Sequence, residues 1–414
     1  MKLMVIFVIN ARFLANARDI PYGAAGYTRT MAAGLRALGH DVCLIGYRRE
    51  PAHPRESASL RWEQRLGCPY AEVAFHTETP AQTMRTTFAE AVTRLGEGRR
   101  SHTPLALYHQ SSYTLPFTPD GVLCAVTHHA PFVEDVARNI GADHCVTAFG
   151  GGRAKVDALL GSQERGMDWL RDRPHVRVLE FSTLQIDCLR RQGISADQCS
   201  VLPPPLLSHA APPDPDAPRP LVSWMERATG RTLLISTAAR ADGFKNLGAV
   251  IDAYRVIEGR GDRAALYLAC GSRQGARQVE ELREQVPQHL RRHCVIGPRL
   301  PHSSMLSTFR SLAGRGIFLF TSRYETLGFT PLEAMNQGLV AAVPAPPTSI
   351  GMRDYVPAEF LYSPLAGGDG IADVVQCHVS SRQASTMASE AVRELTVRAS
   401  VAHIEEYLTP IERT

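Results

Sequence analysis

A chain of 414 residues is longer than one hydrophobic core usually serves, so its length predicts two domains. The 45 Lys and Arg residues against 41 Asp and Glu residues leave a net charge of +4, which gives no overall attraction to nucleic acid, so any anion site must be local. Nine single cysteines without a C-x-x-C pair argue against a zinc or redox motif and favour a reducing, cytoplasmic compartment.

The first fifty residues predict a strand, a helix and a second strand. Residues 3–9 form an apolar run that is too short for a membrane span and lacks a small-residue cleavage site, so we expect a buried strand. A helix at about 24–38 and a strand at 41–46 complete a βαβ unit, and a covered parallel sheet is expected. Three more strands are predicted in this half: 122–127, 145–148 and 176–181.

Proline dominates residues 203–220, where eight prolines in eighteen positions suit neither a helix nor a central strand. We place a linker at 206–221, between an N-terminal domain at 1–205 and a C-terminal domain at 222–385. The tail at 386–414 is predicted to form a helix that packs back on the N-terminal domain. The second half again alternates strands with helices, and its predicted strands are these: 233–237, 265–269, 294–296, 316–320 and 339–343.

Residues 316–338 contain the richest set of candidate site residues. An apolar strand is followed by a loop with Glu325, and a helix is predicted with Thr330 as its N-cap, Pro331 as its first residue and Glu333 in its first turn. Open α/β sheets bind ligands at such a loop, where free backbone N–H groups suit phosphate or sugar oxygens. Taken by themselves, the two glutamates have an ordinary structural explanation. Glu333 would stabilise the dipole of its helix, and Glu325 would be exposed to solvent.

A second strand, loop and helix occur upstream, and Arg240 and Lys245 follow the strand together. Two cations at this place would neutralise a diphosphate leaving group without a metal. The alternative is a pair of solvated surface cations. Lys245 is one of only three lysines among the 45 basic residues, which suggests that a compact ammonium is needed there.

These two segments resemble the retaining GT-B glycosyltransferases, in particular the large family 4 of the glycogen synthase-like, E-x7-E superfamily. The family's G-R-x-x-x-x-K element has Ala239 in place of its glycine here. The matching residues are the following: Arg240, Lys245, Thr321, Ser322, Glu325, Gly328, Glu333, Ala334, Met335 and Gly338. The resemblance implies a GT-B fold, in which two Rossmann-like, doubly wound parallel-sheet domains face a central cleft.

The resemblance also assigns roles to single residues. Glu325 would contact hydroxyls of the donor sugar, Glu333 would bind the ribose, and Arg240 with Lys245 would stabilise the departing diphosphate. The donor-binding set implied by the resemblance is the following: Gly23, Gly26, Arg240, Lys245, Gly297, Arg299, Leu300, Glu325, Thr326, Leu327, Gly328, Phe329 and Glu333.

Two parts of this set match the family only loosely. Gly23 and Gly26 stand at the start of the first helix, where the family has a glycine pair near the donor phosphate. The absence of G-x-G-x-x-G disfavours a dehydrogenase there. The nucleobase would lie at the turn of residues 297–300, for which an ordinary strand-end turn is the alternative.

The segment Thr127-His128-His129 ends an apolar strand of the first half. The family's T-x-H pattern selects His129, which would bridge donor and acceptor hydroxyls, and a structural, hydrogen-bonded histidine is the alternative. His128 is expected to point to the opposite side. The catalytic residues implied by the resemblance are the following: His129, Arg240, Lys245 and Glu325.

We therefore expect a cytoplasmic, retaining hexosyltransferase that moves a sugar from a nucleoside-diphosphate sugar to a hydroxyl of a small molecule or glycoconjugate, as in bacterial specialised metabolism. UDP is favoured over GDP on family frequency. No metal is expected, because the only D-x-D, Asp214-Pro215-Asp216, lies in the proline-rich linker. No cofactor, nucleic acid or integral membrane segment is expected either. The alternatives are a GT-B-type nucleotide-sugar epimerase or phosphorylase, and a non-catalytic sugar-nucleotide-binding protein.

Overall fold

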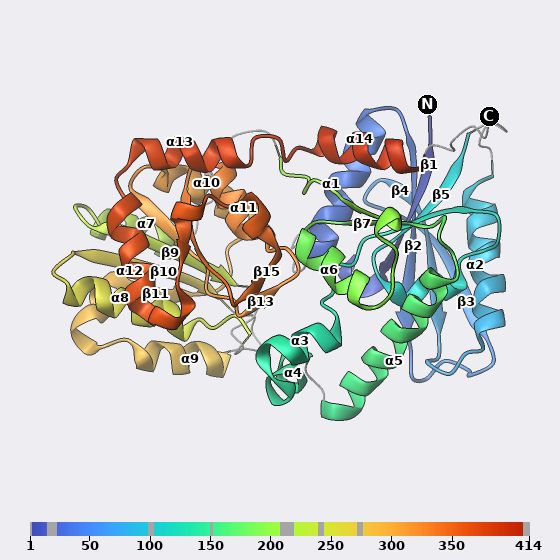
Figure 1. Ribbon diagram of the computed structural model, residues 1–414, viewed down its shortest axis with the longest axis horizontal. Helices are drawn as coiled ribbons and strands as arrows, with labels where there is room; N and C mark the ends of the chain where they lie inside the picture. The colour runs from blue at the N-terminus through green and yellow to red at the C-terminus, as the bar shows by residue number, and fades with distance from the viewer. Residues whose placement is uncertain are drawn as a thin grey trace. The chain divides into compact units, whose positions relative to one another are not determined.

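The computed structural model describes residues 2–14, 23–97, 103–149, 152–207, 219–238, 244–270 and 276–408 (Figure 1). Its internal contacts divide the chain into two compact units. The first unit comprises residues 1–133, 154–207 and 395–414, and the second comprises 134–153 and 208–394. The predicted linker lies mostly outside the described residues, as do Asp214, Asp216 and Arg240. The domain boundaries drawn from the sequence stay predictions.

The first unit is built on an eight-stranded sheet of order β3-β4-β2-β1-β5-β6-β7-β8. All neighbouring strands are parallel except β3 and β4, which form an antiparallel edge. β1 lies inside the sheet, and its residues from Met4 to Ile9 are buried, as an apolar strand covered on both faces must be. The strands are β1 (Met4–Asn10), β2 (Asp41–Arg49), β3 (Ala58–Arg65), β4 (Cys68–Phe75), β5 (Leu105–His109), β6 (Leu123–Val126), β7 (Arg177–Glu180) and β8 (Cys199–Val201).

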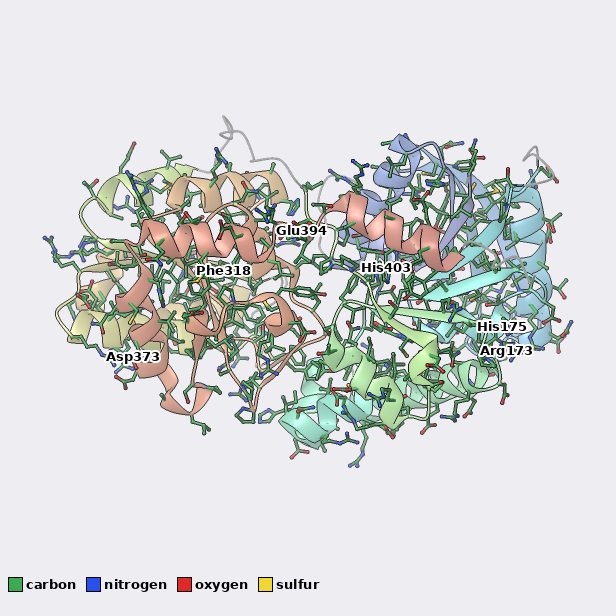
Figure 2. The ribbon with its side chains drawn as sticks, turned by 45° about the horizontal axis from the view of Figure 1, so that its top comes forward. Arg173, His175, Phe318, Asp373, Glu394 and His403 are labelled. Carbon is green, nitrogen blue, oxygen red and sulfur yellow. The ribbon has the colours of Figure 1, made fainter. Side chains whose placement is uncertain are left out.

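The helices of the first unit cover this sheet, and the last helix of the chain is one of them. Ser400 Oγ donates to the carbonyl oxygen of Pro203 at 2.6 Å, and the His403 ring lies 2.8 Å from Ser200 Oγ (Figure 2). A Cβ atom on Gly34 would lie 2.3 Å from Val397, so α1 and α14 pack with almost no space between them. The helices are α1 (Gly23–Ala37), α2 (Ala81–Leu95), α5 (Gly152–Arg171), α6 (Thr183–Arg191) and α14 (Val397–Leu408).

The second unit has a six-stranded parallel sheet of order β11-β10-β9-β12-β14-β16. Phe318 of β12 is fully buried in its core and meets Phe309 edge-on at 5.3 Å (Figure 2). The strands are β9 (Thr232–Ala238), β10 (Ala264–Cys270), β11 (Cys294–Gly297), β12 (Gly316–Leu319), β14 (Val340–Pro344) and β16 (Leu361–Tyr362), with a separate pair β13 (Tyr324–Glu325) and β15 (Ser349–Ile350).

Helices separate the strands of the second unit, as the alternating sequence pattern predicts. The helices assigned to the second unit are α3 (Val133–Ile140) and α4 (Ala142–Phe149), which lie between β6 and β7 in the chain, and α7 (Arg219–Arg227), α8 (Gly248–Gly259), α9 (Ala276–Gln285), α10 (His302–Leu312), α11 (Phe329–Asn336), α12 (Gly367–His378) and α13 (Arg382–Ala391). None of the helices in the described ranges combines the length and the hydrophobicity that a membrane crossing requires.

Three local predictions are wrong. Residues 145–148 belong to helix α4, because a four-residue apolar run does not distinguish a strand from a short helix. The helical tail consists of two helices, α13 and α14, with a break at 392–396. Helix α11 begins at Phe329, with Gly328 as its N-cap, so Thr330 is inside the helix and Glu333 lies in its second turn.

Candidate functional site

Lys245 and Glu325 form an ion pair in the second unit. Their side chains are 20% and 17% exposed, so both charges are mostly shielded from water. Ser322 Oγ also donates to Glu325 Oε1 at 3.1 Å, and Thr321 Oγ1 donates to the carbonyl oxygen of Lys245 at 3.0 Å. The structure therefore brings together two of the predicted site residues, which stand 80 positions apart in the sequence.

The sheet explains why these residues meet. β9 and β12 are parallel neighbours, so the loops that follow them leave the same edge of the sheet. The backbone joins the two loops as well, because the N–H of Arg323 donates to the carbonyl oxygen of Phe244 at 2.9 Å. Arg240 belongs to the first of these loops but lies outside the described residues, so its proposed partnership with Lys245 stays a prediction.

Helix α11 presents its amino end to the loop that contains Glu325. Gly328 caps it in the left-handed conformation, with φ of +93°, which glycine adopts without strain. A Cβ atom at this position would also lie only 2.3 Å from Met352 Cε. The N–H of Met352 donates to the carbonyl oxygen of Leu327 at 3.0 Å, so residues 326–328 are held in a tight turn at the helix start. The first backbone N–H groups of a helix lack intrahelical partners and suit phosphate oxygens.

Glu333 has a partner that the sequence did not reveal. His302 Nε2 lies 2.7 Å from Glu333 Oε1, and the two side chains are 30% and 20% exposed. His302 is the first residue of α10, directly after the turn at residues 297–300, which is predicted to hold the nucleobase. The contact therefore places that turn near the glutamate predicted to bind the ribose. A histidine two residues after Leu300 is the only signal of this partner in the sequence.

The turn at residues 297–300 follows β11 directly. Leu300 is 2% exposed and belongs to the core, so its side chain does not face a ligand. Gly297 ends the strand and pairs with Ala269 of β10. Within this turn, the backbone and the side chains of Pro298 and Arg299 are therefore left to contact a nucleobase.

In the first unit, the two strand-end histidines point to different sides, as predicted. The His128 ring pairs with Glu180, which is fully buried, and lies 4.9 Å from the ring of Phe132. The His129 ring lies between Tyr27 and Phe181, with centroid distances of 4.7 and 5.3 Å.

The end of β7 and the start of α6 form hydrogen bonds with Thr127 and His128 and so fix the segment 127–129. Thr127 Oγ1 donates to the carbonyl oxygen of Leu179, and the backbone N–H of His128 donates to both carboxylate oxygens of Glu180 at 3.2 Å. Gln185 Nε2 donates to the carbonyl oxygen of His128 at 2.6 Å. We call residues 179–185 the β7–α6 cradle, because they fix the backbone from which His129 projects.

Burial and, to a smaller extent, the neighbouring His128 lower the pKa of His129 to about 3. The ring is therefore neutral at ordinary pH and does not suit proton shuttling near pH 7. Its Nε2 atom is buried and has no hydrogen-bond partner among the described residues. A neutral imidazole with one ring nitrogen left without a partner can form one hydrogen bond with a sugar hydroxyl.

The amino end of α1 lies beside His129. Gly23 begins this helix and Gly26 is in its first turn, directly before Tyr27, whose ring lies tilted against that of His129. The two predicted features of the first unit, the glycine pair and the histidine, therefore occur at one place. The role of each glycine toward a donor stays a prediction. Across the described ranges, no three His, Cys, Asp or Glu side chains are grouped so that they could hold a metal ion.

No protein-family profile matches this sequence, and no curated protein matches it either. Solved structures match it over nearly its whole length. Sucrose-phosphate synthase from Thermosynechococcus elongatus is 16% identical, with 98% of each chain covered and a TM-score of 0.68. A glycosyltransferase from Rickettsia africae is 13% identical, covering 99% of this chain and 100% of that one, with a TM-score of 0.66. HepE from Anabaena, solved with UDP and glucose, is 14% identical, with coverages of 99% and 100% and a TM-score of 0.63.

The chain therefore has the GT-B fold of these glycosyltransferases, with two Rossmann-like units that each contain a parallel sheet. The fold class predicted from the sequence is confirmed. At sequence identities of 13–16%, the likeness to these structures establishes the fold alone.

Proposed function

We propose that this protein is a nucleotide-sugar-dependent glycosyltransferase that acts with retention of configuration and without a metal. The observation that carries the proposal is the group formed by Lys245, Glu325 and Ser322 at the carboxyl edge of the second sheet, beside the amino end of α11. A cation and the amino end of a helix suit a diphosphate, and a carboxylate suits sugar hydroxyls. The GT-B fold raises the prior for this chemistry by analogy.

The proposed reaction uses the residues as follows. Lys245, with Arg240, neutralises the charge that develops on the diphosphate as the bond between the sugar C1 and the phosphate oxygen breaks. A bond from C1 to the acceptor oxygen forms on the same face, and the acceptor proton goes to the departing phosphate oxygen. Glu325 holds sugar hydroxyls once Lys245 has turned from it to the diphosphate, and Glu333 binds the ribose.

The finer assignments belong to the same proposal. Membership of family 4 and UDP as the preferred nucleotide follow from the sequence resemblance, and a cytoplasmic location follows from the nine single cysteines. The acceptor is proposed to be a small molecule or a glycoconjugate. HepE, which shares the fold, was solved with UDP and glucose, and this supports testing UDP-glucose first.

The test is incubation of the pure protein with UDP- and GDP-sugars and a panel of acceptors, with and without EDTA, followed by mass spectrometry. A glycosylated product and free nucleoside diphosphate, formed equally with EDTA, are expected. An isomerised donor would indicate the epimerase, sugar phosphate formed from phosphate would indicate the phosphorylase, and an unchanged donor would indicate a binding protein. Activity that EDTA removes and manganese restores would contradict metal independence.

Two variants test the division of roles within the site. Glu325→Ala should lose turnover but still bind UDP, whereas Glu333→Ala should weaken UDP binding by about 1.5–3 kcal/mol, the value of a charged hydrogen bond. Calorimetry with UDP measures the difference, and Glu390→Ala on the exposed side of α13 is the control. Equal loss of UDP binding in both variants would reject the assignment.

A further inference from the structure

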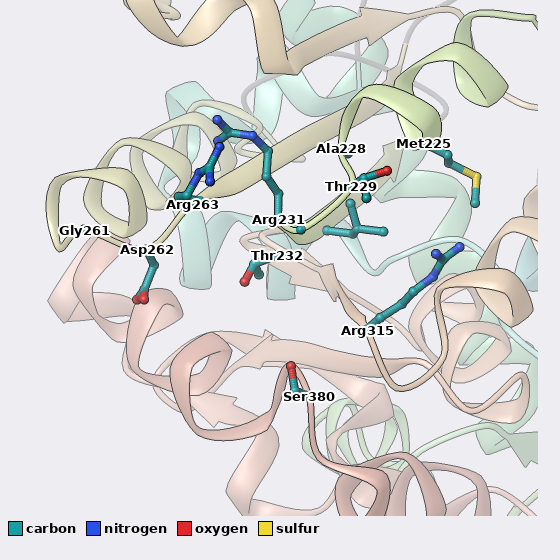
Figure 3. A pocket seen from close by; sticks show the side chains of 12 residues that line it. Met225, Ala228, Thr229, Arg231, Thr232, Gly261, Asp262, Arg263, Arg315 and Ser380 are labelled. Carbon is teal, nitrogen blue, oxygen red and sulfur yellow. The ribbon is translucent and has the colours of Figure 1, made fainter.

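A second basic site lies at the opposite edge of the sheet of the second unit. Arg231, Arg263 and Arg315 each directly precede the first residue of a strand, namely of β9, β10 and β12. These strands are parallel neighbours in the order β10-β9-β12, so their amino ends meet at one edge. The three arginines therefore line one cavity, of about 580 Å³ (Figure 3). Lys245 and Glu325 follow the carboxyl ends of the same sheet.

Arg231 gives this cavity a fixed, buried cation. Its side chain is only 7% exposed, and its Nη1 atom donates to Glu258 Oε1 and to the carbonyl oxygen of Ala264, both at 3.0 Å. Glu258 is itself held by the N–H of Ala264 at 2.7 Å. Within the described ranges, Nε and Nη2 of Arg231 have no hydrogen-bond partner. Two donors of an immobilised guanidinium are thus left for a ligand.

The other two arginines add charge that the described residues do not neutralise. Arg263 has no hydrogen bond or ion pair with any described side chain, and Arg315 uses only Nε, which donates to the carbonyl oxygen of Ser311 at 2.9 Å. Both side chains are exposed and line the cavity, and in Figure 3 Arg315 lies on the other side of it from Arg231 and Arg263. A group of cations with spare N–H donors suits phosphate oxygens.

The rest of the lining suits hydroxyl groups. Thr229, Thr232 and Ser380 contribute hydroxyls, and Asp262 contributes a carboxylate that accepts a hydrogen bond from Gln376. A carboxylate repels a polyphosphate but accepts hydrogen bonds from the hydroxyls of a polyol. The cavity volume also exceeds what a single phosphate ion needs.

We propose that this cavity binds a phosphate monoester of a polyol, with the phosphate on Arg231 and Arg263, the hydroxyls toward Asp262, and Arg315 contacting the ligand from the other side of the cavity. The site is separate from the proposed donor site, because it lies at the amino ends of the strands. It does not depend on the proposed function.

Glycerol 3-phosphate is the probe, measured by calorimetry without any nucleotide sugar. Binding to the wild-type protein should weaken by at least about tenfold in Arg263→Ala and in Arg315→Ala, the loss expected when a charged hydrogen bond is removed. Both residues are exposed, so these variants should fold, which thermal unfolding checks. Arg277→Ala on α9, where the side chain is 90% exposed, is the charge-matched control and should bind normally. Lys245→Ala should bind normally as well.

Asp262→Ala should change the binding of two probes in opposite directions. It should weaken glycerol 3-phosphate binding and strengthen inorganic pyrophosphate binding, since it removes a hydroxyl acceptor and a negative charge together. The absence of glycerol 3-phosphate binding to the wild-type protein would overturn the proposal. A loss of glycerol 3-phosphate binding that is confined to Lys245→Ala, or that is equal in all variants including Arg277→Ala, would also overturn it. So would inorganic phosphate that binds as tightly as the ester. Binding of the protein to phosphatidylglycerol vesicles that glycerol 3-phosphate does not displace would overturn it as well.

Discussion

Lys245 and Glu325 illustrate how one ion pair serves two proposed tasks. The ammonium is assigned to the diphosphate and the carboxylate to the sugar, and each neutralises the other while they are in contact. A group that is mostly shielded from water needs such a partner, because an uncompensated buried charge is costly. The pair therefore holds both side chains in place at the edge of the sheet.

Lys245→Arg tests whether a compact cation is required. Arginine keeps the charge but replaces a small ammonium with a wider planar fork, so it should crowd both Glu325 and the diphosphate. We expect normal folding and a turnover reduced by at least roughly tenfold, about 1.4 kcal/mol in the barrier. Lys2→Arg is the control, because Lys2 forms an exposed ion pair with Asp41 at 3.0 Å. Wild-type turnover in Lys245→Arg would show that any cation suffices.

At the scale of elements, the β7–α6 cradle predicts a positioning role for residues that touch no substrate. Gln185→Ala removes the bond to the carbonyl oxygen of His128 and should let the backbone before His129 relax. If His129 contacts donor and acceptor, turnover should fall several-fold while UDP affinity stays unchanged, because the nucleotide is assigned to the second unit. Gln185→Glu cannot donate this bond and should behave like the alanine variant.

Gln192→Ala is the matched control for this prediction. Gln192 stands just after the end of α6, outside the cradle, and should tolerate the change. Kinetics and the melting temperature separate the two interpretations of Gln185. A loss of stability with unchanged turnover of the folded protein would leave Gln185 as an ordinary structural residue.

The turn at Gly328 allows two sources of strain to be measured separately. Gly328→Ala combines a left-handed backbone with a Cβ atom 2.3 Å from Met352 Cε, whereas Gly314→Ala has φ of +72° and open space around it. Gly314→Ala should cost about 1–2 kcal/mol in stability, and Gly328→Ala should cost more. In a Met352→Ala background, the further change Gly328→Ala should cost only the backbone part, because the contact with Met352 is already gone. Equal costs at the two glycines, measured by urea unfolding, would show that Met352 moves freely.

The sequence predicted those elements whose cause is local. β1 is a continuous apolar run, β9 contains the apolar residues 233–235, and the start of α11 is marked by Gly328 and Pro331. β3 was missed because an edge strand with alternating, partly exposed residues has little apolar signal. The failure at α4 has the same origin, since a short segment is decided by its surroundings.

The part of the site that depends on pairs distant in sequence could not be predicted. Glu180 is 52 residues from His128, and Glu333 is 31 residues from His302, so no spacing rule connects them. The three arginines before β9, β10 and β12 are visible in the sequence, but they form a group only once the strand order is known.

For the whole molecule, the two units share no sheet, so each is expected to contribute its own term to unfolding, and a single two-state free energy would be misleading. Two histidines of the first unit, the fully buried His109 and the partly exposed His129, have rings that are shielded from water. Burial lowers the pKa of each to about 3. Its stability should therefore depend on pH in a way that a defined pair of residues explains.

The sign follows from linkage. An unfolded histidine titrates near pH 6.5, so below that value the unfolded chain binds protons that the folded first unit excludes. Stability is complete above pH 6.5 and falls as the pH is lowered toward 3. At pH 5.5 each histidine should already have cost about 1.4 kcal/mol relative to neutral pH, about 2.8 kcal/mol together.

The measurement is urea unfolding of the first unit at pH 7.5 and 5.5, followed by near-ultraviolet circular dichroism, in the wild-type protein and in His109→Asn. The variant should be less stable at pH 7.5, because His109 holds Thr114 Oγ1 at 2.8 Å and Thr118 Oγ1 at 3.0 Å. Its loss between the two pH values should nevertheless be smaller by about 1.4 kcal/mol, since one titrating group is gone. His175→Asn, in which an exposed histidine of the same unit is replaced, should keep the wild-type pH dependence. If His109→Asn also keeps it, then His109 takes up its proton in the folded protein, and the acid sensitivity of the first unit must come from other groups.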